Sequence, residues 1–128
     1  ARPEIKHLSL GHTEAVPAGV YAKEWLEKTG LWKSIATKVV PAENVRAAMA
    51  VVESGNAEAG IVYKTDAAIS KKITVALEIP VAEGPEIIYP AAVVKDSRNP
   101  YAARKLLAFL ADKKADETFA KFGFSVLE

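Results

Sequence analysis

Three short apolar runs alternate with two helical patterns in the first half of the chain, and this order constrains the fold more than any other feature. The apolar runs are residues 5–10, 38–40 and 59–63. Each run is short enough for a buried strand. A strand–helix–strand–helix–strand order, in which each helix crosses between neighbouring strands, predicts a parallel sheet and therefore an α/β fold.

Local signals mark where the two helices begin and end. Pro17 suits the first position of a helix that runs to Lys28 and ends at Gly30. Asn44 is a plausible N-cap for a second helix, which Gly55 ends. The apolar residues of the second helix have the spacing of one helical face, namely Val45, Ala48, Met49 and Val52.

The second half of the chain has a different pattern. Residues 73–79 alternate apolar and polar side chains, and residues 87–94 form a further extended run, so the sequence predicts two strands without a helical crossover. A helix with Asn99 as its cap follows, and a last short helix carries Phe119 and Phe122.

Composition excludes several classes of function. The 17 basic and 16 acidic side chains give a net charge of +1, which argues against a nucleic-acid partner. Cysteine is absent, so disulfides and thiol chemistry are excluded. The sequence has no run of about 18 apolar residues that would span a membrane. It begins without methionine or the apolar run of a signal peptide, as expected of a mature or trimmed chain.

No motif typical of an enzyme occurs in the sequence. The phosphate-loop, dinucleotide and nucleophile-elbow patterns are all missing. A metal site at His7, His12 and Glu14 is conceivable, but the spacing of the two histidines matches neither a helical pair nor strand alternation. We therefore expect no catalytic residues, no cofactor and no direct cation site.

Three loops are candidates for a ligand site, because ligands of open parallel sheets bind beyond the carboxyl ends of the strands. They are residues 11–19, 41–45 and 63–66. The first two lead into helix N-termini, where backbone N–H groups attract anions, and Tyr63 could add a hydroxyl donor. An α/β domain whose loops bind only water has the same pattern, so both interpretations stay open on these residues alone.

Six segments of the chain have the order and spacing of one known family, namely residues 16–24, 31–32, 41–48, 60–63 with 65–67, 88–91 and 119–124. They resemble the periplasmic molybdate-binding proteins of bacterial ABC importers. The resemblance runs from about Leu8 to Phe124 and covers only the latter half of a family member. It implies an α/β, three-layer fold with a mostly parallel sheet and helices on both faces, one lobe of a type II periplasmic binding protein.

The family resemblance also implies a domain organisation and a site. Residues 1–94 would form oxyanion-binding lobe two, and residues 95–128 a C-terminal helical segment that returns to lobe one, which is absent from this sequence. The implied oxyanion contacts are the backbone N–H groups of Ala18 and Val45 and the hydroxyl of Tyr63. Two further serines in the family belong to lobe one.

The function implied by the resemblance is that of the substrate-binding component of a molybdate or tungstate ABC transporter. Its partners would be the oxyanion, the membrane permease and the missing lobe one. Its location would be the periplasm, or an extracytoplasmic position anchored to the membrane in the parent protein. The alternative is an effector-sensing or interaction domain of a regulator, which would normally carry a helix-turn-helix and a basic face.

The C-terminal helices lead to a further expectation. Ala103, Leu106, Leu107 and Leu110 lie on one helical face, and without lobe one they would form an exposed apolar patch with the phenylalanines that follow. We expect a homodimer, with domain swapping as one way to form it.

Overall fold

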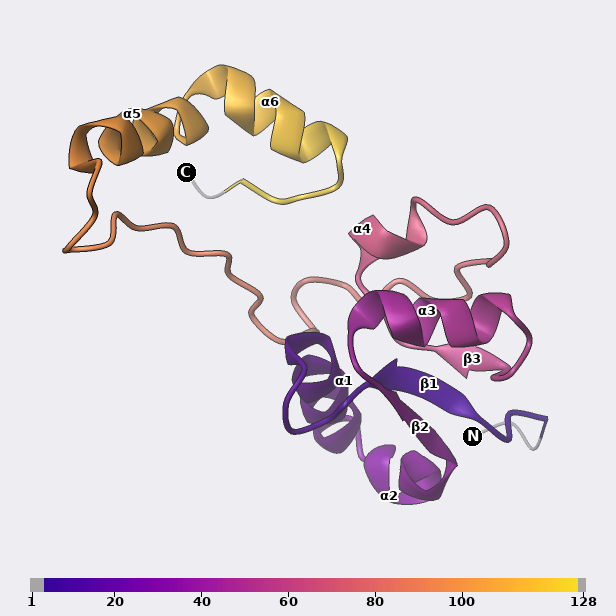
Figure 1. The fold of residues 1–128 in the computed structure, drawn as a ribbon. Coiled ribbons are helices and arrows are strands. Elements are labelled where there is room, and N and C mark those ends of the chain that lie inside the picture. Colours follow the sequence, from indigo (N-terminus) through magenta and orange to yellow (C-terminus); the bar gives the residue numbers. More distant parts are fainter. Residues whose placement is uncertain (1–3, 127–128) are drawn as a thin grey trace. The chain divides into compact units, whose positions relative to one another are not determined.

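The computed structural model describes residues 4–126, which form two compact units (Figure 1). The first unit extends to Glu86 and the second begins at Ile87. Within residues 4–126, no helix is long and apolar enough to cross a membrane. In chain order the helices and strands are β1 (Leu8–Gly11), α1 (Pro17–Lys28), α2 (Trp32–Ile35), the 3₁₀ helix η1 (Ala36–Lys38), β2 (Val39–Ala42), α3 (Val45–Glu53), β3 (Ala59–Gly60), α4 (Lys64–Ala67), α5 (Pro100–Leu110) and α6 (Lys113–Lys121).

The first unit is built on a three-stranded parallel sheet with the strand order β2-β1-β3. The central strand β1 pairs with β2 as far as Gly11 opposite Ala42. The edge strand β3 is only two residues long, although the Ile61 N–H still donates to the Ser9 carbonyl at 3.0 Å. The predicted parallel sheet is confirmed.

The helices cover both faces of this sheet. The connection from β1 to β2 through α1 and the connection from β2 to β3 through α3 run across the sheet in opposite directions. Right-handed crossovers therefore place α1 and α3 on opposite faces, as Figure 1 shows. The predicted three-layer α/β arrangement is confirmed.

The core lies mainly between β1 and α1. Leu8 and Leu10 point to one face of the sheet and pack against Ala22 and Leu26. Ser9, between the two leucines, is also fully buried and points to the other face, which α3 covers. Six partly buried residues pack around this core, namely Trp25, Trp32, Ile35, Val39, Ala59 and Ile61.

The first turns of α1 meet the end of β1 at a contact that leaves no room for side chains. A Cβ atom added at Gly19 would lie 2.0 Å from the Gly11 carbonyl oxygen and 2.7 Å from the His12 carbonyl oxygen. A Cβ atom added at Gly11 would lie 2.6 Å from Cγ1 of Val16. This approach holds the N-terminus of α1 directly against the carboxyl end of β1.

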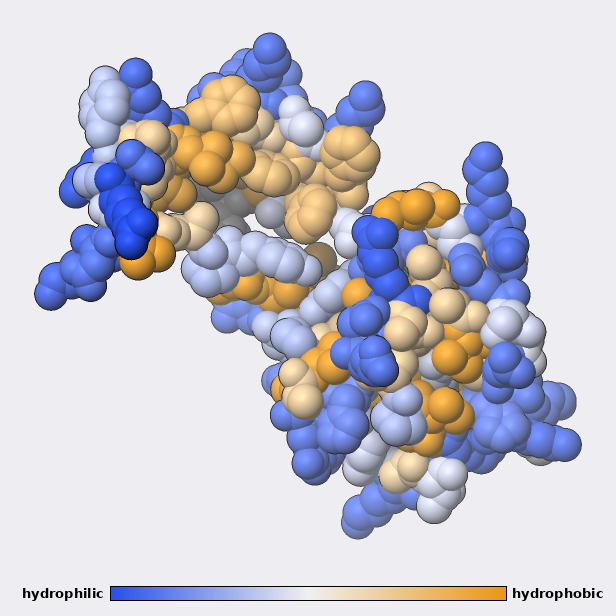
Figure 2. Space-filling model, viewed as in Figure 1, coloured by the Kyte–Doolittle hydropathy of each residue, from blue (hydrophilic) through white to orange (hydrophobic). Residues whose placement is uncertain are grey.

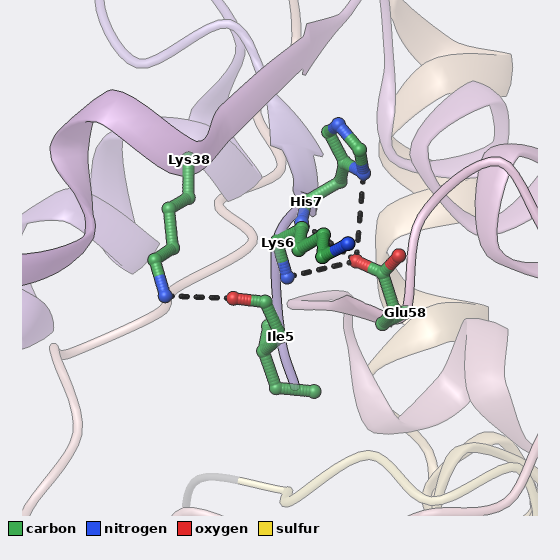
Figure 3. Close-up of polar contacts among 5 residues, drawn as sticks. All are labelled: Ile5, Lys6, His7, Lys38 and Glu58. Carbon is green, nitrogen blue, oxygen red and sulfur yellow. Dashed lines mark hydrogen bonds and ion pairs between the residues drawn. The ribbon is translucent and has the colours of Figure 1, made fainter. Parts of the chain in front are cut away.

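At the amino ends of the strands, Glu58 fastens the segment before β1 to the loop before β3 (Figure 3). Its Oε2 atom accepts hydrogen bonds from the backbone N–H groups of His7 at 2.6 Å and Lys6 at 3.0 Å. The bond from the His7 N–H contributes most to a lowered pKa of the Glu58 carboxyl, because it stabilises the charged form. Lys38 Nζ donates to the Ile5 carbonyl at 2.7 Å beside this contact.

The sequence pattern predicts two strands that the structure does not contain, so these two predictions are wrong. Residues 73–79 and 87–94 pair with no other strand in the described part of the chain. Val75 and Leu77 are more than half exposed. Alternating side chains provide a strand with an apolar face, but a strand forms only where a neighbouring strand exchanges backbone hydrogen bonds with it. In contrast, α4 lies where the pattern predicts a loop.

The second unit contains the two predicted C-terminal helices, and its apolar side chains are largely exposed. α5 has no buried residue, and Asp112 caps α6 by accepting a hydrogen bond from the Ala115 N–H at 2.8 Å. Figure 2 shows apolar side chains gathered over these helices. We call the exposed residues of this set the C-terminal apolar face: Leu106, Phe109, Phe119, Phe122 and Phe124.

Gly19→Ala is predicted to destabilise the first unit, because the new methyl group would meet backbone atoms that cannot move aside without separating α1 from β1. We expect a loss of roughly 1–3 kcal/mol in the free energy of unfolding, which outweighs the better helix propensity of alanine. Urea denaturation, monitored by circular dichroism, measures this change in the free energy of unfolding.

The matched control is Gly84→Ala. A Cβ atom there would lie no closer than 3.5 Å to its neighbours, so we expect a change within about 0.5 kcal/mol. Equal stability of the Gly19→Ala variant and the wild type would contradict the close contact.

Candidate functional site

The three loops that the sequence singles out leave the sheet at one edge. β1 ends at Gly11 directly opposite Ala42, the last residue of β2, and the His12 N–H donates to the Ala42 carbonyl at 2.9 Å. Because all three strands are parallel, residues 12–16, 43–44 and 61–63 follow their carboxyl ends. This edge is where ligands bind in open α/β sheets.

Ala18 is the second residue of α1 and is buried. The N–H groups of Gly19 and Val20 both donate to the Val16 carbonyl at 2.9 Å, which turns the chain into the helix. No residue in the range 4–126 accepts a hydrogen bond from the Ala18 N–H. The first turn of α1 therefore presents an unused backbone donor, as the sequence predicts for a helix that begins at Pro17.

Val45 is the first residue of α3 and is half-buried. Asn44 is the N-cap that the sequence predicts, because its Oδ1 atom accepts a hydrogen bond from the Ala47 N–H at 2.8 Å. The described residues offer no acceptor to the N–H groups of Val45 and Arg46. A second helix N-terminus thus presents unused donors at the same edge of the sheet.

Tyr63 immediately precedes α4 and its side chain is half-buried. Its carbonyl accepts hydrogen bonds from the N–H groups of Asp66 at 3.1 Å and Ala67 at 3.0 Å. These bonds hold the Tyr63 backbone at the start of α4, just beyond the end of β3.

An ion pair that the sequence analysis missed joins the Val45 and Tyr63 segments. Arg46 Nε lies 3.3 Å from Asp66 Oδ1. Asp66 is only 8% exposed, whereas the Arg46 side chain is 70% exposed. The one available signal was that opposite charges follow Val45 and Tyr63 closely, and the sequence alone does not show that they meet.

The donors at this edge suit an anion that is bound without a cationic side chain. No lysine or arginine occurs in residues 11–19, the guanidinium of Arg46 faces the Asp66 carboxylate, and Lys64 pairs with Glu78. Helix N-termini carry a partial positive charge, so backbone N–H groups alone attract an anion. A single class of chemistry follows from these groups, which is the donation of hydrogen bonds to negatively charged oxygen atoms.

The two histidines contact different residues in different parts of the first unit. His7 is held by Glu58 at the amino ends of the strands, while His12 Nδ1 accepts a weak hydrogen bond from the Glu14 N–H at 3.4 Å. Among the described residues, no group of three or more histidine, aspartate or glutamate side chains could hold a metal ion.

Comparison with known proteins shows which family the chain is similar to. The family described as "Bacterial extracellular solute-binding protein" matches residues 1–125. The Molybdate-binding protein ModA of Escherichia coli is 40% identical over 119 residues, which are 93% of this chain and 46% of that protein.

Two solved structures share the fold. One, described as the substrate binding domain of a molybdenum ABC transporter from Clostridium difficile, is 35% identical with a TM-score of 0.81, over 99% of this chain and 56% of that one. The periplasmic molybdate-binding protein of Azotobacter vinelandii has a TM-score of 0.82 at 18% identity, over 97% of this chain and 55% of that one. The chain spans about half the length of the curated relatives it matches.

Proposed function

Because the chain belongs to the bacterial extracellular solute-binding proteins, we propose that it supplies one lobe of the substrate-binding component of an ABC importer, with molybdate or tungstate as ligand. The observation that carries the proposal is the pair of unused backbone donors, at Ala18 and Val45, on the same sheet edge as Tyr63. The role is binding and delivery, without catalysis.

In this proposal the N–H groups of Ala18 and Val45 and the hydroxyl of Tyr63 donate to the oxygen atoms of a tetrahedral dianion. Each hydrogen bond to a charged oxygen contributes roughly 1.5–3 kcal/mol of binding free energy. A site lined by donors favours a fully deprotonated anion, because the proton of hydrogenphosphate would find no acceptor there. Molybdate and tungstate carry no such proton near neutral pH.

The rest of the site would come from outside this chain. The chain spans about half of its curated relatives, so we propose that residues 1–94 form lobe two, that residues 95–128 return to lobe one, and that two serines of lobe one complete the contacts. Without them about 3–6 kcal/mol of binding free energy is missing. The extracellular description of the family supports an extracytoplasmic location, where the loaded protein would meet the membrane permease.

The experiment that tests this function is a titration of the ¹⁵N-labelled chain with molybdate, tungstate and phosphate near neutral pH. We expect the amide resonances of Ala18 and Val45 to shift with molybdate and tungstate, with dissociation constants well above 1 μM, a value that corresponds to about −8.2 kcal/mol. Phosphate should bind clearly more weakly.

Each alternative result has a distinct meaning. Equal affinity for phosphate would contradict the donor-only site, and submicromolar molybdate affinity would contradict the need for a second lobe. Unchanged resonances at millimolar molybdate would refute the proposed function.

Val45→Pro is predicted to weaken molybdate binding by roughly 1.5–3 kcal/mol, because proline has no N–H to donate. The fold should survive, since the first helical position favours proline. Asn44 is already extended, with φ −158° and ψ 171°, as the residue before a proline must be. The same titration measures the change in affinity.

Val45→Ala is the matched control, because it shortens the side chain and keeps the N–H. We expect it to bind molybdate nearly as well as the wild type. If the two variants bind equally, the Val45 N–H is not a ligand contact.

For the 128-residue chain by itself, we propose that a second copy covers the C-terminal apolar face. Leu106, Phe109 and Phe122 are each more than half exposed, and soluble monomers rarely leave a large contiguous apolar patch uncovered. The irregular segment 87–99 is long enough to carry α5 and α6 to a partner, so exchange of these helices is one route to the dimer.

Sedimentation equilibrium should therefore show a dimer. Phe109→Glu should shift the equilibrium towards monomer, since a charge would replace a ring that the dimer would bury. Val81→Glu is the control, because Val81 lies in the first unit and is 87% exposed. A monomer whose α5 and α6 amides are protected from hydrogen exchange would show instead that these helices repack within one chain.

A further inference from the structure

We propose that Asp66 is a positioning residue of the anion site, which acts through Arg46 to hold the N-terminus of α3 in place relative to Tyr63. This inference rests on the proposed function, since it assigns a role to a residue beside the proposed ligand contacts. Asp66 itself is not proposed to touch the anion.

The contacts form a short path between two of the proposed donors. Arg46 directly follows Val45 in the first turn of α3, and its Nε atom lies 3.3 Å from Asp66 Oδ1. The Asp66 N–H donates to the Tyr63 carbonyl at 3.1 Å. The ion pair is thus one polar contact between the segment that carries Val45 and the segment that carries Tyr63.

The burial of Asp66 supports a geometric role for this pair. The Asp66 side chain is only 11% exposed, so its charge is held largely out of water. A buried carboxylate is costly unless it is paired, and breaking such a pair leaves an uncompensated charge. Because its partner Arg46 is anchored in α3, the carboxylate restricts how far the α3 N-terminus can move away from α4.

A second ion pair in the same region provides an internal contrast. Lys64, the residue after Tyr63, pairs with Glu78, and the two side chains are 63% and 58% exposed. Water screens such a pair, and long exposed side chains hold one geometry poorly. We therefore expect the Lys64–Glu78 pair to have little influence on the position of Tyr63.

The positioning role and a purely electrostatic role predict opposite changes in anion affinity for the Asp66→Asn variant. If the Asp66 charge served mainly to cancel that of Arg46, then Asp66→Asn would expose a net positive charge beside the site and would raise the affinity for a dianion. If Asp66 positions the donors, the same variant lowers the affinity, because the Val45 N–H and the Tyr63 hydroxyl no longer converge.

The experiment compares Asp66→Asn and Arg46→Lys with the control Glu78→Gln in the full chain. We expect both test variants to weaken molybdate binding by about tenfold, the scale of an orienting partner next to a ligand contact. The amide resonances of Val45 should shift in both without ligand, whereas Glu78→Gln should change neither property. Arg46→Lys keeps the charge at a largely exposed side chain, so this variant should fold and its affinity can be measured even if Asp66→Asn unfolds.

A double variant separates positioning from a general loss of stability. If Asp66 acts by placing the Tyr63 hydroxyl, adding Asp66→Asn to Tyr63→Phe should cost much less than the tenfold seen in the wild-type background. Higher molybdate affinity in Asp66→Asn, unshifted Val45 resonances or full additivity with Tyr63→Phe would overturn the proposal. If the wild type fails to bind molybdate, the proposed function falls, and the ligand-free Val45 resonances still decide whether the pair controls this edge.

Discussion

The close contact between α1 and the end of β1 is the constraint on which the first unit depends. Gly19 and Gly11 bring two backbones together at distances that exclude any side chain. A helix that approaches a strand this closely has its N-terminus fixed at the carboxyl end of that strand. The same contact seats the Ala22 and Leu26 face of α1 on the central strand, where the core forms. The contact between Gly19 and Gly11 therefore determines both the packing of α1 on β1 and the position of the unused donor at the start of α1.

The proposed binding through neutral donors has a structural consequence for the sheet edge that the Arg46–Asp66 pair adjoins. Helix N–H groups are directional and short in reach, so they bind an anion only where several of them converge. A flexible cationic side chain would tolerate more variation in position, but the guanidinium near this edge is paired with a carboxylate of the protein itself. A site of this kind requires that the elements presenting its donors be held firmly with respect to one another.

The unpaired segments and the C-terminal apolar face have one property in common, which is an apolar pattern without a packing partner in the described part of the chain. Residues 73–79 have an alternating pattern but no neighbouring strand, and α5 has an apolar face but no buried residue. Both patterns are typical of elements that pack against something else. The chain spans about half the length of the relatives it matches.

The sequence by itself determined those features that depend on residues close together in the chain. Pro17 and Asn44 start their helices through local geometry and capping, so the two helix N-termini could be identified as candidate anion sites, and the alternation of apolar runs and helices was enough to predict a parallel sheet. The family resemblance then singled out the N–H groups of Ala18 and Val45. Their role in binding stays a prediction. Only the tertiary structure decided that β3 is two residues long, that residues 73–79 form no strand and that Asp66 meets Arg46. Strand pairing and ion pairs join residues that are distant in sequence, and no local pattern records which partner a residue will meet.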